Sequence, residues 1–479
     1  MGKHAGPAVL ADGRAAPVPP PAGNAAAGRG GRHAAPAGPP SRSVGRVLLA
    51  SGAARLLVLP VTGLASLVVS AVVTRAVGVE QFGAVMLVAT LSQLLLFADL
   101  GAGAAVATAV ARVEEPDGAE VFRRTLLTAV RTMLLSAGTI AVVAVAVGAL
   151  GWWPSLLGIS ADPGGGLSAD VATVLSLLAF SASLPCLLGE AVLRGSGRLH
   201  QAVLLAGLAG PVSLLVTLVL YWADAPVFAY AVTLPLGGLV GWGACALVAG
   251  RSVRPLLAGL PGQVLHRRRF PGRRIASTAV PWFIVMVGLP IALQTDRIVL
   301  AHRADARALS DYSYVTQLYS PLWSVVSMAA LALWPVFAGR PGPGGLRRSW
   351  LRSVAVLSAM GVTFAVALLV LAGPVIDQVS DDRATVGWAL LGCFAALLVV
   401  QSVHVGTGIL LIAPAQLRFQ AGCVVALVVT NLPLSWALAP SMGAAGPVVA
   451  SIATVLCCQL VPGVLAGRRA TGRAAGEVG

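Results

Sequence analysis

The chain has 479 residues, of which 57% are hydrophobic and only 11% are charged. Soluble domains carry about 25% charged residues, so the composition excludes an ordinary soluble protein and is typical of a membrane protein. The net charge of +15 does not indicate nucleic acid binding, because most of the Lys and Arg residues fall in links that the positive-inside rule assigns to the cytoplasm.

Residues 1–45 are rich in Ala, Gly and Pro and predict a disordered cytoplasmic tail. The rest of the chain predicts an all-α, polytopic membrane protein with about 12 transmembrane helices, because its apolar runs have the length of a membrane-crossing helix. We expect a multi-pass protein of the cell membrane with both termini in the cytoplasm. Two pseudo-symmetric six-helix lobes, 46–250 and 276–466, flank a basic cytoplasmic linker, 251–275, and a cytoplasmic tail follows at 467–479.

The predicted spans are 55–74, 83–107, 125–150, 171–193, 202–222, 227–249, 276–295, 313–337, 353–376, 386–410, 421–439 and 444–466. Span one ends at Arg75, and span seven ends at the pair Asp296-Arg297. Each is followed by a short polar link and a span that begins with an aromatic and a small residue, Phe82-Gly83 and Tyr312-Ser313. This repeat predicts a pseudo-two-fold axis along the membrane normal, with a binding cavity between the halves.

The arginines at these two span ends are candidate substrate-binding residues. A guanidinium presents a planar fork that suits a phosphate, so Arg75 and Arg297 facing one cavity would attract a diphosphate. Asp296 is included in the candidate site because it adjoins Arg297. The alternatives are an interfacial position for both arginines, or an ion pair of Arg297 with Asp296 or Asp311.

Span eight carries an aromatic face. Tyr312, Tyr319 and Trp323 recur at positions i, i+7 and i+11, with Gln317 nearby. Aromatic rings and amides suit sugar faces and hydroxyls, so we include Gln317, Tyr319 and Trp323 in the substrate site. The alternative is an aromatic belt at the membrane interface.

Two further polar residues are candidates for ion coupling. Asp99 lies towards the inner half of span two, where it would bind a cation or proton, pair with Arg112, or cap a helix beside Gly101. His404 lies three residues after Gln401 on one face of span ten, as a proton relay or a hydrogen-bonded core residue. Intramembrane ionisable groups are functional candidates because they are costly to bury.

Several chemistries are missing from the sequence. The single lysine, Lys3, lies in the tail, so no Walker A phosphate loop and no ATP site can form. Neither the histidines nor the six cysteines have metal-ligand spacing, so we expect no metal and no cofactor. A glycosyltransferase usually needs a large outer loop or domain that bears carboxylates. The link between the first two spans has only Glu80, and the outer cluster of Asp377, Asp381 and Asp382 does not alone make an active site. We therefore expect a transporter rather than an enzyme, with coupling to H⁺ or Na⁺ left open.

The order of three motifs resembles the Wzx-type O-antigen and exopolysaccharide flippases of the multidrug/oligosaccharidyl-lipid/polysaccharide exporter superfamily. The resemblance covers about residues 45–466. The motifs are Arg75-Ala-Val-Gly78 with Gln81-Phe82-Gly83 and Asp99-Leu-Gly101; Asp296-Arg297 with Asp311-Tyr312-Ser313 and Trp334-Pro335; and Asn431-Leu-Pro-Leu with Gly443-Ala-Ala-Gly446.

This resemblance implies an alternating-access flippase that moves lipid-diphosphate-linked oligosaccharide from the cytoplasmic to the outer leaflet. It also implies three partners, which are a lipid-linked oligosaccharide as the substrate, the lipids of the membrane, and a polysaccharide polymerase machinery. The alternatives are a cation-coupled multidrug exporter of the same superfamily, with Asp99 or Asp296 as the carrier, and a membrane glycosyltransferase.

Overall fold

The structure, a computed structural model, describes residues 44–161, 166–254, 260–265, 280–338, 343–381, 383–384, 386–411 and 414–476. The chain divides into two compact units, Met1–Val44 and Gly45–Gly479. Everything below concerns the second unit. The predicted N-terminal tail, most of the basic linker and the last three residues lie outside the described residues.

The N-terminal half of this unit is helical in all its described elements. They are α1 (Val44–Val77), α2 (Val79–Thr90), the 3-10 helix η1 (Leu91–Asp99), α3 (Ala102–Ala111), α4 (Gly118–Ala149), α5 (Trp153–Leu157), α6 (Ala169–Ser183), α7 (Leu187–Gly195), α8 (Leu199–Ala206), α9 (Ala209–Trp222), the 3-10 helix η2 (Val227–Val232) and α10 (Thr233–Ser252). A short helix, α11 (Leu260–Leu265), follows in the linker.

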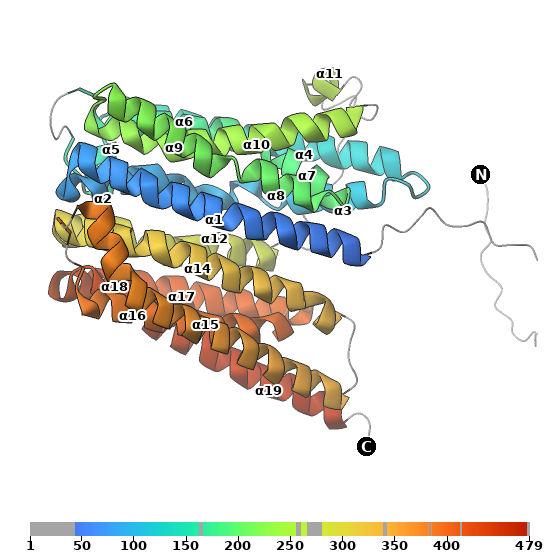
Figure 1. The fold of residues 1–479 in the computed structure, drawn as a ribbon. Helices are drawn as coiled ribbons and strands as arrows, with labels where there is room; N and C mark the ends of the chain where they lie inside the picture. Colours follow the sequence, from blue (N-terminus) through green and yellow to red (C-terminus); the bar gives the residue numbers. More distant parts are fainter. Residues whose placement is uncertain are drawn as a thin grey trace, which may run out of the picture. The chain divides into compact units, whose positions relative to one another are not determined.

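The C-terminal half continues this pattern. Its elements are α12 (Val280–Gln294), α13 (Asp296–Arg303), α14 (Ala306–Ala338), α15 (Pro343–Ser380), α16 (Trp388–Gly408), the 3-10 turn η4 (Ile409–Leu411), α17 (Pro414–Met442), α18 (Ala445–Thr454), the π-helical segment η5 (Val455–Leu460) and α19 (Val461–Gly476). Figure 1 shows that the start of α1 and the end of α19 lie at the same end of the helices, as an even number of crossings requires.

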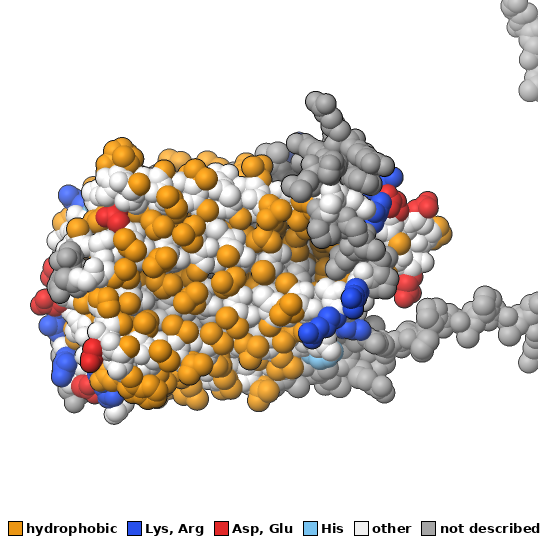
Figure 2. Space-filling model, turned by 90° about the horizontal axis from the view of Figure 1, so that it is seen from above, with side chains coloured by type: hydrophobic (Ala, Val, Ile, Leu, Met, Phe, Trp, Pro, Cys, Tyr) orange, Lys and Arg blue, Asp and Glu red, His pale blue; other side chains and the backbone are white. Residues whose placement is uncertain are grey.

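Among the described residues, eleven helices are long and apolar enough to cross a membrane. Figure 2 shows hydrophobic side chains over the middle of the visible face and charged ones towards its two ends. Helix α14 is not among the eleven, yet its 33 residues reach about 50 Å at about 1.5 Å each, which exceeds a bilayer core of about 30 Å. With α14 included, the described part of every predicted span lies almost wholly on one helix or on consecutive helices, which confirms the all-α, polytopic prediction.

Span two differs from the continuous helix predicted over 83–107. It is broken between η1 and α3, where Leu100 and Gly101 have φ of 50° and 76°. A left-handed backbone cannot continue a right-handed helix, and glycine adopts it readily. The carboxylate of Asp99 accepts a hydrogen bond from the Gly103 amide at 3.0 Å and so caps the new start of α3.

The two halves pack against each other mainly through α2 and α14. The largest buried cluster includes Phe82 and Val85 of α2 together with Tyr314 and Val315 of α14. Gly83 permits this approach, because a Cβ there would lie 2.7 Å from the Ser310 amide nitrogen. Small residues let backbones come close in membranes, where van der Waals packing drives helix association.

Close packing inside the N-terminal half gives the first prediction. A Cβ at Gly189 of α7 would lie 2.3 Å from Cα of Ala246 in α10. We expect Gly189→Val to destabilise the fold by about 1–3 kcal/mol, because overpacking forces the two helices apart. Thermal unfolding of the purified protein in detergent measures this. Gly138→Val is the control, since nothing lies within 4 Å of its added Cβ, and equal shifts for both variants would contradict the prediction.

Candidate functional site

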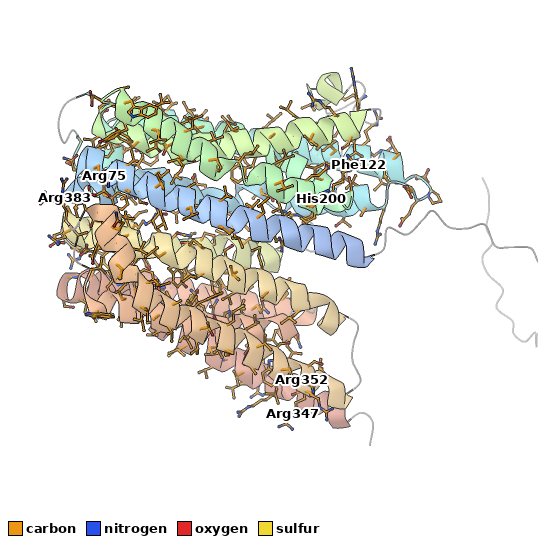
Figure 3. The ribbon with its side chains drawn as sticks, viewed as in Figure 1. Arg75, Phe122, His200, Arg347, Arg352 and Arg383 are labelled. Atoms are coloured by element: carbon orange, nitrogen blue, oxygen red, sulfur yellow. The ribbon has the colours of Figure 1, made fainter. Side chains whose placement is uncertain are left out.

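Arg75, at the end of α1, forms an ion pair with Asp381, which follows α15. Its Nε and Nη2 donate hydrogen bonds to the two Asp381 carboxylate oxygens at 2.8 and 2.7 Å. This bidentate contact, the rim contact, joins the two halves on an exposed surface. Figure 3 places Arg75 and Arg383 at the opposite end of the helices from Arg347 and Arg352.

The rim contact is stable at neutral pH. Hydrogen bonds from the Arg75 guanidinium, together with its charge, lower the pKa of the Asp381 carboxyl group. The carboxylate therefore stays ionised, and the pair loosens only as the pH falls through this lowered pKa. Because both groups are exposed, water and salt screen the attraction, so the rim contact alone cannot hold the halves together.

A second layer of contacts between the halves lies beneath the rim contact, and we call it the α2–α14 joint. The rings of Phe82 and Tyr314 stack with centroids 4.2 Å apart and planes 7° from parallel. The Tyr314 hydroxyl shares a hydrogen bond of 2.7 Å with the Thr74 hydroxyl of α1. The Gly83 amide donates to the Ser310 hydroxyl at 2.9 Å. These groups are buried, so their hydrogen bonds are protected from competing water.

Arg297 extends the joint along α2, to Thr90 at the end of that helix. It is only 6% exposed, and its guanidinium donates a hydrogen bond to the Thr90 hydroxyl of α2. Its predicted alternative, an ion pair with Asp296 or Asp311, is not among the ion pairs of the described residues. One hydroxyl engages only part of a group with about five N–H donors, so Arg297 retains donors for an anion.

Asp296 points instead into the C-terminal half. Its carboxylate accepts a hydrogen bond from the Tyr312 hydroxyl at 3.1 Å and interacts with the Ser451 hydroxyl. Ser451 in turn accepts a hydrogen bond from the Asn431 amide at 3.1 Å, and Asn431 accepts one from Ser435 at 2.7 Å. We call these five residues the Asp296 cluster. A buried carboxylate among hydroxyl and amide oxygens can hold a proton or a small cation of the kind that prefers oxygen ligands.

The aromatic face of α14 does not lie on an open surface. Tyr319 is buried against Phe394 of α16, with ring centroids 5.3 Å apart, and its hydroxyl bonds to Gln401. Trp323 is partly buried and packs against the same core. Gln317 differs from Tyr319 in that it contacts the other half. Its amide oxygen accepts a hydrogen bond from the hydroxyl of Ser66 in α1 at 2.6 Å.

No hydrogen bond among the described residues joins the two ion-coupling candidates, Asp99 and His404, to the α2–α14 joint or to the Asp296 cluster. Asp99 caps α3, which is one of the roles considered from the sequence. His404 is partly buried, and its Nδ1 is a buried atom without a hydrogen-bond partner. Among the described residues, no group of three or more His, Cys, Asp or Glu side chains could hold a metal ion.

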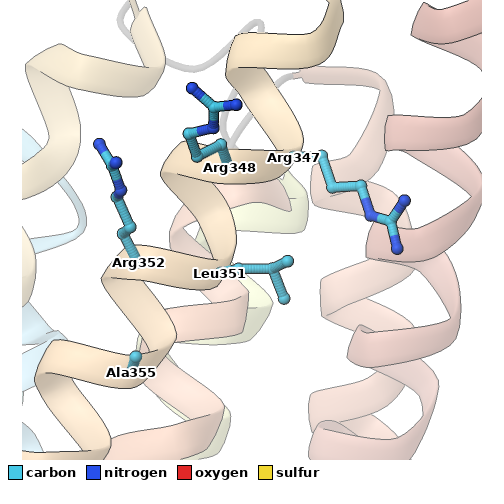
Figure 4. A pocket seen from close by; sticks show the side chains of 5 residues that line it. All are labelled: Arg347, Arg348, Leu351, Arg352 and Ala355. Atoms are coloured by element: carbon cyan, nitrogen blue, oxygen red, sulfur yellow. The ribbon is translucent and has the colours of Figure 1, made fainter.

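Sequence reasoning missed one basic pocket. It has a volume of about 440 Å³ and is lined by Arg347, Arg348, Leu351, Arg352 and Ala355 near the start of α15 (Figure 4). The positive-inside rule accounts for arginines at a helix end, so these three were assigned to topology alone. The sequence does contain one signal for this pocket. The first eight turns of α15 have no Asp or Glu that could neutralise the three arginines.

Sequence comparison places the chain in a family. The family described as "Polysaccharide biosynthesis protein" matches residues 48–339, which is more than half of the chain. The chain belongs to this family. No curated protein matches the sequence.

Three solved structures resemble this polysaccharide biosynthesis protein in fold. A multidrug resistance MATE family transporter of the MOP superfamily, in an inward-facing conformation, has a TM-score of 0.63 and 12% identity, over 86% of this chain and 95% of that one. A MOP superfamily transporter from Pyrococcus furiosus has a TM-score of 0.61 and 13% identity, over 90% and 96%. The lipid II flippase MurJ, in an inward closed conformation, has a TM-score of 0.59 and 12% identity, over 88% and 87%. The fold is therefore that of the MOP superfamily.

The rim contact gives a prediction about access to the joint. Thr74 is 1% exposed and lies directly before Arg75, so we expect a cysteine placed there to react slowly with a membrane-impermeant maleimide. Arg75→Ala should raise the labelling rate several-fold, because the halves then separate more often at this end. Asp381→Ala should raise it equally, and the double variant no further, since both remove one interaction.

The measurement uses a background in which the six native cysteines are replaced. Arg383→Ala is the control, because it removes an exposed arginine near Asp381 that forms none of the ion pairs of the described residues. Independent, additive effects of Arg75→Ala and Asp381→Ala would show that the two residues do not act as a pair.

Proposed function

We propose that this protein is a flippase that moves lipid-diphosphate-linked oligosaccharides across the cell membrane during polysaccharide biosynthesis, from the cytoplasmic to the outer leaflet. Membership of the polysaccharide biosynthesis protein family supports the substrate class, and the MOP fold supports transport. The observation that carries the proposal is Arg297, a buried guanidinium that stands at the contact between the halves with donors to spare.

Transport of this kind requires the halves to separate at one end and close at the other. In this structure they are held together at the Arg75 end by the rim contact and the α2–α14 joint. Opening that end would release Arg75 from Asp381 and Arg297 from Thr90. The freed guanidiniums would then face the cavity and attract the diphosphate of a substrate that has entered from the cytoplasmic end.

The sugar part of the substrate would meet helix α14. Gln317 would exchange its bond with Ser66 for a sugar hydroxyl when the halves separate. Tyr319 and Trp323 lie deeper along the same helix and would shape the wall of the cavity. Membrane lipids and a polysaccharide polymerase machinery are the proposed partners, and no ATP site is part of this proposal.

Coupling to H⁺ or Na⁺ would act through the Asp296 cluster. Asp296 and Arg297 are consecutive residues at the start of α13, so a change at the carboxylate is transmitted directly to the arginine that holds Thr90. A proton or cation bound to Asp296 would thereby bias the contact between the halves, which is what coupling requires. Asp99 and His404 remain candidate coupling residues from the sequence.

The substrate proposal predicts the effect of Arg297→Ala. We expect polysaccharide export from cells to fall about tenfold to a hundredfold at unchanged protein level, since a charge-assisted hydrogen bond to phosphate is worth about 1.5–3 kcal/mol. Arg297→Lys should recover only part of the export, because it keeps the charge but loses the fork. Arg303→Ala, at an exposed arginine of the same helix, is the matched control.

Unchanged export in Arg297→Ala would remove this residue from the substrate site. Loss of resistance to cationic drugs, with export intact, would favour the multidrug exporter. Sugar transfer by the purified protein would favour the glycosyltransferase.

The coupling proposal predicts the effect of Asp296→Asn. In vesicles that contain a fluorescent lipid-diphosphate oligosaccharide, we expect transport to lose its response to an imposed H⁺ or Na⁺ gradient, because the neutral amide cannot exchange charge. Substrate binding should change little, since Asp296 contacts its own half. Asp377→Asn, at an exposed carboxylate of α15, is the control. A gradient response that survives Asp296→Asn contradicts the assignment.

A further inference from the structure

The basic pocket at the start of α15 lies outside the proposed substrate site. It is defined by Arg347, Arg348, Leu351, Arg352 and Ala355, and all five side chains are exposed. The three guanidinium groups spread from α15 around Leu351 (Figure 4). Helix α15 packs mainly against α14, α16 and α19, all of its own half, so the pocket belongs to the outer surface of the C-terminal half.

Positive charge in this pocket has no acidic partner among the residues that the structure describes. None of the ion pairs of the described residues involves Arg347, Arg348 or Arg352. Helices α16, α17 and α19 contain no Asp or Glu, and the only acidic residue of α15 is Asp377, near its far end. The three arginines of the pocket therefore have no ion-pair partner among the described residues and are available to an anion.

Several arginines of the N-terminal half have a different environment. At the same end of the helices, where Figure 3 places Phe122 and His200, four arginines of this half are paired with glutamates of the same element or turn. The pairs are Arg112–Glu115, Arg123–Glu120, Arg124–Glu120 and Arg194–Glu190. Topology requires only that arginines lie at this end, so it does not explain why these four are paired with glutamates and the three arginines of the pocket are not.

An exposed apolar stripe runs along α15 from the pocket. It consists of Leu351, Ala355, Val362, Val366 and Val370, with the four larger side chains 52%, 48%, 54% and 63% exposed. Successive members lie four or seven residues apart, so they share one helix face. From Leu351 to Val370 the stripe covers about 29 Å at about 1.5 Å per residue, close to the bilayer core of about 30 Å.

We propose that the pocket and stripe form a binding site for an acidic phospholipid of the surrounding membrane. The phosphate group of the lipid accepts hydrogen bonds from Arg347, Arg348 and Arg352, and an acyl chain lies along the stripe. The pairing of a three-arginine head site with an apolar face of bilayer length selects a lipid over a soluble phosphate. Basic pockets at the cytoplasmic ends of transmembrane helices bind anionic headgroups in this way.

The test is lipid binding by the purified full-length protein, measured by native mass spectrometry with phosphatidylglycerol and phosphatidylcholine of identical acyl chains. We expect the variant Arg347→Gln/Arg348→Gln/Arg352→Gln to bind phosphatidylglycerol roughly a hundredfold more weakly, and each single variant about fivefold more weakly. Phosphatidylcholine binding should stay weak throughout. The exposed arginines tolerate glutamine, and the thermal midpoint of each variant verifies folding.

The matched control is Arg112→Gln/Arg124→Gln/Arg194→Gln, which removes three arginines that are paired with glutamates. Full phosphatidylglycerol binding by this control supports the proposal. An equal loss in the control, or equal binding of phosphatidylcholine, would show that the site is not selective and would overturn it. Displacement of phosphatidylglycerol by inorganic phosphate would assign the pocket to a soluble anion. Displacement by a polyprenyl diphosphate at equal concentration would assign it to the transport substrate.

Discussion

The α2–α14 joint is the contact on which the observed arrangement of the protein depends. Without a side chain at Gly83 the two helices approach closely enough for Phe82 and Tyr314 to stack and for Ser310 to accept a backbone hydrogen bond. The burial of Arg297 and the position of the rim contact both follow from this approach. Inside a membrane the hydrophobic effect does not favour helix association, so packing of this kind must supply the attraction.

The pair Asp296-Arg297 shows how buried charge is divided between the halves. Asp296 takes all its described partners from the C-terminal half, whereas Arg297 is bonded to Thr90 of the N-terminal half. Neighbouring residues on a helix point in directions about 100° apart, so one peptide link joins a network internal to one half to a contact between halves. A rearrangement of the Asp296 cluster therefore strains the hydrogen bond of Arg297 to Thr90, and loss of that bond strains the cluster.

The sequence predicted the membrane class and the spans well, because apolar length is set by the thickness of the bilayer. The sequence also places Glu190 and Arg194 at i, i+4, and the structure pairs them, because such neighbours on a helix meet locally. It did not predict that Arg297 would bond to Thr90, a residue 207 positions away, because such pairings depend on how separate helices pack.

The dependence of long-range contacts on helix packing also explains the other differences between the prediction and the structure. The break after Asp99 depends on two left-handed residues, of which only Gly101 is marked by its type. Tyr319 lies at the predicted helical spacing, but whether that face meets a cavity or Phe394 is decided by the position of α16. The basic pocket at the start of α15 was not predicted, because the positive-inside rule accounts for each of its arginines singly.

The hydrogen bonds of α14 have a consequence for the assembly of the protein. Gln317 and Tyr314 are bonded to Ser66 and Thr74 of α1, which is synthesised before α14. Tyr319 is bonded to Gln401 of α16, which is synthesised after it. Because an unsatisfied polar group is costly inside a bilayer, the polar side chains of α14 reach their final surroundings only after α16 has entered the membrane.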